Sequence, residues 1–135
     1  MAAPTKTVAQ KLLIKPGTTV WATPEEHLPL IGALPVDVDV ADVLSTATTG
    51  LMFATDESAL HRLLDEHRDG LSGPVNFWVV YPKGNKADIN WDSLRRILAE
   101  YGMRPIAQIA VDETWSALRF RMLREGEVFD AGARD

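Results

Sequence analysis

The sequence predicts a single α/β domain with a mostly parallel sheet, and three observations support that class. First, strand-like runs alternate with segments of helical periodicity, which is the pattern of parallel strands joined by helical crossovers. Second, the run VNFWVVY at residues 75–81 is apolar on both faces, as a central parallel strand is. Third, 135 residues suffice for one domain and leave no room for two.

The first strand is expected at residues 18–22, after a helical turn at residues 8–14. A short helix should follow this strand. Thr23 would be its N-cap, Pro24 would take the first helical position, and Glu26 would complete a capping box.

The middle of the chain predicts two strands and a helix. Residues 36–40 alternate valine with aspartate, which indicates a strand with one wet side at an edge of the sheet. Residues 51–54 form a short apolar strand. Asp56 can then cap a helix at residues 57–68, whose leucines share one face.

The last part of the chain supplies the remaining elements. After the strand at residues 75–81, Asn90 can cap a helix at residues 91–101. Residues 106–111 and 116–123 predict two strands joined by a tight turn, so the last strand is antiparallel. Right-handed crossovers and this hairpin favour a mostly parallel sheet of six strands in the order 2-1-3-4-6-5, with helices on its faces in a three-layer arrangement.

The composition of the chain limits the kinds of chemistry that it can carry out and indicates where in the cell it is found. The chain has no cysteine, which excludes disulfides, thiolate catalysis and cysteine-ligated metal sites. Its net charge of −5 argues against general nucleic-acid binding. No apolar run is long enough for a signal peptide or a membrane span, so we expect a cytoplasmic protein without membrane association. The domain should cover residues 1–123, with flexible residues 1–6 and a flexible acidic tail at 124–135.

Two segments resemble a known family. YPKGNKADI at residues 81–89 and VDETWSALRFR at residues 111–121 resemble a family of small bacterial proteins that is defined only as a domain of unknown function. The opening KLLIKPGTTVW at residues 11–21 is similar to the usual start of that family. The resemblance covers residues 8–123 and implies a Rossmann-like domain, similar to a shortened methyltransferase core. It implies no established activity and transfers no catalytic residue.

The likeness to methyltransferases carries an expectation about the cofactor. Class I methyltransferases hold theirs at a glycine-rich loop after the first strand. This chain has Thr23, Pro24, Glu25 and Glu26 at that position and no glycine. The two carboxylates would repel a phosphate or the carboxylate of S-adenosylmethionine at a helix start that otherwise attracts anions. We therefore expect no bound S-adenosylmethionine, no NAD and no other cofactor.

Polar side chains follow the fourth and fifth strands, at the edge where open parallel sheets bind ligands. One interpretation is a small-molecule or phosphate site, in which lysines bind the anion, carboxylates act as acid or base, and an indole stacks on the ligand. The other is that lysines and acids form ion pairs that join two loops. The candidate residues are Lys83, Asn85, Lys86, Asp88, Asp112, Glu113 and Trp115.

Two other sets of residues are weaker candidates for a metal site and a proton-transfer site. Glu57, His61 and Asp65 are spaced by four residues and would line one helix face, which suits a weak metal site or, more simply, a solvated surface. The surface interpretation is favoured, and no metal is expected. His27 follows the two glutamates and is either a proton shuttle or a surface residue.

The leading hypothesis for function is a degenerate methyltransferase-like module that is non-catalytic and binds a protein partner or a second copy of itself. Few helices are available to cover both faces of the sheet, which motivates a homodimer. The alternative is a ligand-binding protein or enzyme that uses the edge after the fourth and fifth strands, so enzymatic activity stays open. A nucleic-acid accessory would need a basic stripe, which could be formed only by Arg95, Arg96, Arg104, Arg119 and Arg121.

Overall fold

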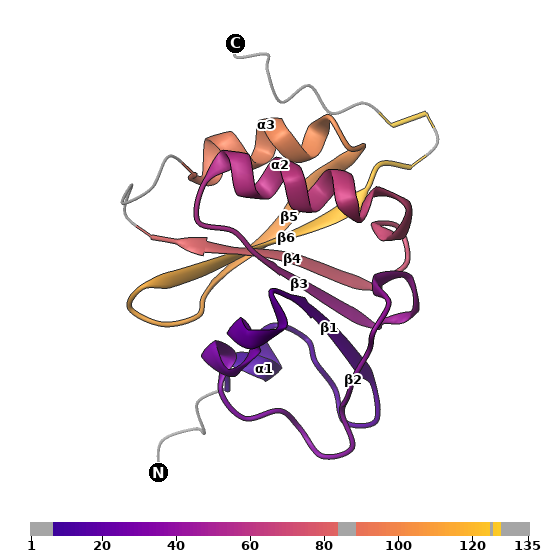
Figure 1. Ribbon diagram of the computed structural model, residues 1–135, viewed down its shortest axis with the longest axis vertical. Coiled ribbons are helices and arrows are strands. Elements are labelled where there is room, and N and C mark those ends of the chain that lie inside the picture. The colour runs from indigo at the N-terminus through magenta and orange to yellow at the C-terminus, as the bar shows by residue number, and fades with distance from the viewer. Residues whose placement is uncertain (1–6, 84–88, 125, 128–135) are drawn as a thin grey trace.

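A six-stranded sheet in the order β2-β1-β3-β4-β6-β5 forms the centre of the protein (Figure 1). The computed structural model describes residues 7–83, 89–124 and 126–127. The first four strands in this order pair in parallel, and β6 pairs antiparallel with both β4 and β5. The predicted strand order and antiparallel last strand are confirmed. The strands are β1 Thr19–Thr23, β2 Asp39–Val40, β3 Thr49–Phe53, β4 Asn76–Pro82, β5 Met103–Ala110 and β6 Trp115–Met122.

Helices cover both faces of the sheet, which makes three layers. Helices α2 (Glu57–Glu66) and α3 (Trp91–Ala99) lie on one face, and α1 (Val8–Lys11) lies on the other (Figure 1). The predicted caps are present, because Asp56 accepts a hydrogen bond from the backbone of Ala59 at 2.7 Å and Asn90 forms a capping box with Ser93. Within the described residues no helix is both long and apolar enough to cross a membrane.

Strand β4 is buried on both faces, as its composition predicts, and it divides the core in two. Phe77 packs under α2 and α3, whereas Trp78 packs on the side of α1. The indole Nε1–H of Trp78 donates to the backbone carbonyl of Leu12 at 3.0 Å, so α1 is held to the centre of the sheet.

The predicted capping box after the first strand is wrong. Thr23 is the last residue of β1, paired with Met52 of β3, and this pairing keeps its backbone extended. A cis peptide leads to Pro24, which precedes the 3-10 helix η1 (Glu25–Ile31) and makes no side-chain cap. Pro29 lies inside η1 and has no N–H for an α-helical bond, which is consistent with the tighter helix.

The second strand is shorter than predicted. Only Asp39 and Val40 pair with β1, because Asp37 adopts a positive φ of 62° and turns the chain just before them. Both paired residues are exposed, and β2 forms an outer edge of the sheet as expected. The crossover to β3 passes through a second short 3-10 helix, η2 (Leu44–Thr46), whose Leu44 is buried in the core.

Candidate functional site

The carboxyl ends of β1 and β3 mark the place where ligands of this architecture are generally found. The two strands are neighbours, and the chain leaves β1 toward β2 but leaves β3 toward β4, on opposite sides. Such a divergence opens a crevice in open α/β sheets. Here the chain enters η1 directly after β1, with Glu25 and Glu26 exposed in its first turn.

Three rings cluster at this end of the sheet. The His27 ring lies 5.6 Å from that of Phe53 and 6.4 Å from that of Trp115, measured between centroids. Phe53 and Trp115 meet edge to face at 6.3 Å. The Nδ1 atom of His27 is buried and has no hydrogen-bond partner among the described residues. His27 therefore packs against two rings at this end of the sheet and is partly exposed.

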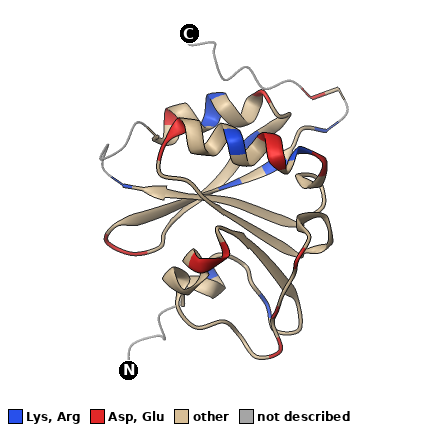
Figure 2. Cartoon of the chain, viewed as in Figure 1, with Lys and Arg blue, Asp and Glu red and all other residues tan. Residues whose placement is uncertain are grey.

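The hairpin between β5 and β6 contributes carboxylates at the same edge (Figure 2). Oδ1 of Asp112 accepts hydrogen bonds from the backbone of Thr114 and Trp115, at 2.7 and 2.8 Å, so this carboxylate shapes the turn. Glu113 is exposed at the tip. Trp115 opens β6 and is partly buried, so it is not at the tip where the predicted strand start would place it.

Lys83 lies beside this hairpin and is joined to it by the backbone. Its N–H donates to the carbonyl of Thr114 at 2.8 Å. Among the described residues no ion pair links Lys83 to Asp112 or Glu113. The other candidates in this loop, which are Asn85, Lys86 and Asp88, lie outside the described residues.

A cavity of about 520 Å³ opens between the end of β4 and the start of α3, and Lys83 is part of its wall. Nε2 of Gln108 donates to Tyr81 Oη at 2.8 Å and to Ser116 Oγ at 3.3 Å, so these polar groups satisfy one another. Trp115 precedes Ser116 in β6, and its side chain therefore points to the other face of the sheet. The structure brings Lys83 to this cavity but places Trp115 away from it.

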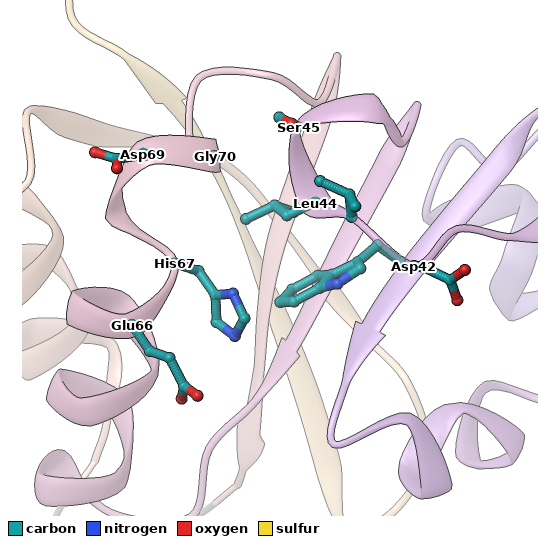
Figure 3. A pocket seen from close by; sticks show the side chains of 9 residues that line it. Asp42, Leu44, Ser45, Glu66, His67, Asp69 and Gly70 are labelled. Carbon is teal, nitrogen blue, oxygen red and sulfur yellow. The ribbon is translucent and has the colours of Figure 1, made fainter.

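A second cavity, of about 280 Å³, was not foreseen from the sequence (Figure 3). The ring of Trp21 on β1 meets that of His67 edge to face at 4.7 Å. Glu66 and His67 stand on one wall, and Asp42 stands on the opposite wall. Asp69 adds a further exposed carboxylate from the 3-10 helix η3 (Arg68–Gly70). These residues come from three separate segments, so no local sequence signal could group them.

On the candidate metal face of α2, Asp65 is exposed and bonds to side chains beside it. Asp65 Oδ1 accepts a hydrogen bond from the Tyr101 hydroxyl at 2.6 Å and lies 3.3 Å from Arg68. Burial, together with this bond, raises the pKa of Tyr101 to about 12, and the same bond lowers the pKa of Asp65. Within the described residues no group of three or more His, Asp or Glu is placed to hold a metal ion.

Comparison with solved structures identifies the fold class of this chain. The structure is similar to a protein of the NADB-Rossmann superfamily from Streptococcus agalactiae, with TM-score 0.58 and 15% identity, over 96% of this chain and 72% of the other. It is similar to a Streptococcus pneumoniae protein described as a candidate tRNA (m1A22) methyltransferase, with TM-score 0.55 and 12% identity, over 85% and 67% of the chains. The fold is Rossmann-like and methyltransferase-like. An uncharacterized Listeria monocytogenes protein also shares it, with TM-score 0.54 and 9% identity, over 95% and 72% of the chains.

These similarities establish the fold alone. The sequence matches no protein-family model and no curated protein. The resemblance of its two segments to the small bacterial family therefore stays a prediction. The Streptococcus pneumoniae protein has also been solved in complex with S-adenosyl-L-methionine, and this chain superimposes on it with TM-score 0.51 and 13% identity, over 85% of this chain and 70% of the other.

The residues after β1 do not fit that methyl donor. A loop that binds an anionic group offers free backbone N–H groups. Here Pro24 has none, and the N–H of His27 already donates to the carbonyl of Pro24 at 3.0 Å. Glu25 and Glu26 are exposed in the first turn that follows. The arrangement opposes the carboxylate of the donor's methionine group, but not its ammonium and sulfonium groups, which are positively charged.

Proposed function

We propose that this protein is a non-catalytic, methyltransferase-like module that acts by binding a protein partner or a second copy of itself. The observation that carries the proposal is the composition of the turn after β1, where a proline and two exposed glutamates stand in place of glycines. The rings of His27, Phe53 and Trp115 also close the end of β3. A cytoplasmic location is part of the proposal.

The hydrogen bonds among polar side chains near the carboxyl end of β4 favour a binding function over a catalytic one. An active site directs titratable groups into empty space. In the cavity beside Lys83, the polar side chains of Tyr81, Gln108 and Ser116 bind one another. Asp112 is likewise engaged by its own turn. These contacts do not favour the alternative of a ligand-binding protein or enzyme at this edge.

Isothermal titration calorimetry with S-adenosylmethionine tests the proposal. We expect no binding tighter than about 1 mM, because Pro24 and the already bonded N–H of His27 leave the carboxylate of the donor without backbone partners in this turn. A Glu25→Gln/Glu26→Gln variant measures the net electrostatic effect of the two glutamates, which repel the carboxylate of the donor and attract its ammonium and sulfonium groups. Micromolar binding of S-adenosylmethionine by the wild-type protein would refute the proposal.

A surface for self-association is present at the β2 edge. Val40 is 42% exposed and lines an apolar groove of about 410 Å³ together with Leu28 and Leu34, and Val36, four residues earlier in the chain, is 68% exposed. The outer side of β2 has no neighbouring strand among the described residues. Exposed apolar side chains beside an open sheet edge are typical of interaction surfaces. We propose that a second copy of the chain covers this edge.

Light scattering after size exclusion tests this homodimer. At about 100 µM protein, where weak dimers with micromolar Kd are populated, we expect a dimer mass for the wild type. Val40→Asp should give a monomer, because it places a charge in the apolar contact. Val75→Asp is the matched control, since Val75 is 74% exposed and lies outside this edge. A monomer mass for the wild type at this concentration would contradict the homodimer.

A further inference from the structure

Arginines stand opposite each other on the β5–β6 hairpin. Arg104 of β5 is the direct cross-strand partner of Arg121 of β6, so the two side chains project from the same face. Arg119 lies two residues earlier on β6 and shares that face. Like charges that face each other across strands are unfavourable without an anion between them. The remaining arginines of the sequence-based stripe, Arg95 and Arg96, lie on α3 and not on this hairpin.

A carboxylate of the same chain occupies the space between the two opposed guanidinium groups. Oε2 of Glu127 lies 2.9 Å from Arg104 Nη1 and 2.7 Å from Arg121 Nη2. Oε1 accepts from Arg121 Nη1 and from the backbone N–H of Arg124, both at 2.8 Å. The contact with Arg121 is bidentate, the strongest form of this pairing. These bonds hold the pKa of Glu127 well below its usual range.

The site has binding capacity beyond Glu127. Arg119 donates to Asn76 Oδ1 at 2.7 Å, but its Nε is buried and has no acceptor among the described residues. Ile106 and Ala107 of the adjacent edge strand are exposed, so an incoming segment can reach the hairpin from this side. Because this Nε is buried, an incoming carboxylate can approach Arg119 only at the exposed part of its guanidinium, and Arg119 is partly exposed.

We propose that Arg104, Arg119 and Arg121 form a binding site for a carboxylate on an acidic segment of a protein partner, and that Glu127 occupies this site in the free chain. The proposal rests on the function proposed above, because it names the partner's chemistry. Glu127 itself shows that a carboxylate fits the fork of Arg121. The net charge of −5 opposes the long polyphosphate chain of a nucleic acid more than a single acidic side chain.

Glu127 regulates this site by competing for it. A tethered group has an effective concentration in the millimolar range, so it displaces weak external carboxylates. A partner must therefore offer more than one contact, for example with Arg119 in addition to Arg121. Removing the Glu127 carboxylate should expose the site without removing any donor.

Fluorescence anisotropy with a labelled, end-blocked oligoglutamate peptide tests the site at low salt. We expect Glu127→Gln to bind the peptide about tenfold more tightly than the wild type, the effect of freeing one charge-assisted contact. Glu100→Gln is the matched control, because Glu100 is exposed at the end of α3 and its replacement changes the net charge equally. Adding Arg121→Gln to Glu127→Gln should abolish the gain.

Two results would overturn the proposal. One is a Glu127→Gln affinity no higher than that of Glu100→Gln. The other is an equal gain for a single-stranded oligonucleotide of similar charge, which would indicate an unspecific anion surface. Because Glu127→Gln could disturb its own segment, the wild-type Arg121 Nε–Hε resonance is followed in parallel, and peptide addition should shift it. The calorimetric test with S-adenosylmethionine does not depend on the arginine site. Failure of the proposed function and failure of the proposed arginine site can therefore be told apart.

Discussion

Replacing Trp78 with alanine is expected to cost about 3–5 kcal/mol of unfolding free energy, since large aromatic truncations in a core have that effect. Trp78 is 1% exposed and sits in the central strand β4. Its truncation would also remove the hydrogen bond that ties Leu12 to the sheet. Small domains have about 5–15 kcal/mol in total, so this single change would leave much of the protein unfolded. Urea denaturation followed by circular dichroism measures the loss.

Two further variants separate packing from the hydrogen bond. Trp78→Phe keeps most of the apolar volume but leaves the Leu12 carbonyl without its donor, which should cost about 1–3 kcal/mol. Trp91→Ala is the exposed control, because Trp91 is 38% exposed and contacts Arg95 at the surface, so its loss should be within about 1 kcal/mol. Equal urea midpoints for Trp78→Ala and Trp91→Ala would contradict the placement of Trp78 in the core.

Replacing Gly73 with alanine is expected to cost at least about 2 kcal/mol, as insertions into tight packing do. A Cβ at this position would lie 2.5 Å from both Cα and the carbonyl oxygen of Ser45. These are backbone atoms of η2, so no side-chain rotation can relieve the contact. Moving η2 away would withdraw the buried Leu44 from the core.

Gly70→Ala is the matched control for this substitution. A Cβ at Gly70 would approach Leu44 and the Ser45 backbone no closer than 3.3 Å, which small shifts can accommodate. The urea midpoint should therefore fall clearly less for Gly70→Ala than for Gly73→Ala. A Gly73→Ala protein with wild-type stability would show that η2 does not pack against this loop as described.

The parallel pairing and the antiparallel last strand could be predicted because local patterns indicate them. The alternation of strands and helices implies parallel pairing, and the tight turn at Asp112 implies the antiparallel last strand. The caps at Asp56 and Asn90 were predictable for the same reason, since each bond joins residues three positions apart. Propensity and tertiary structure agree at these places.

The start of η1 could not be predicted from such local patterns. Thr23 has the sequence context of an N-cap, but its pairing with Met52 on β3 keeps it in the strand. The cavity beside Trp21 and His67 is likewise formed by segments distant in sequence. Glu127 falls in the segment expected to be a flexible tail, yet its carboxylate lies between Arg104 and Arg121. The register of β5 on β6 places Arg104 opposite Arg121, and this register could not be read from the sequence.

The proposal that the end of β1 binds no methyl donor is tested most directly by nuclear magnetic resonance. Amide spectra of the labelled wild-type protein are recorded during titration with S-adenosylmethionine. We predict no saturable shifts for Glu25, Glu26 and His27 after β1, or for Thr55 and Asp56 after β3. Saturable shifts concentrated at these two turns would show that the crevice receives the donor, and would contradict a non-catalytic binding module.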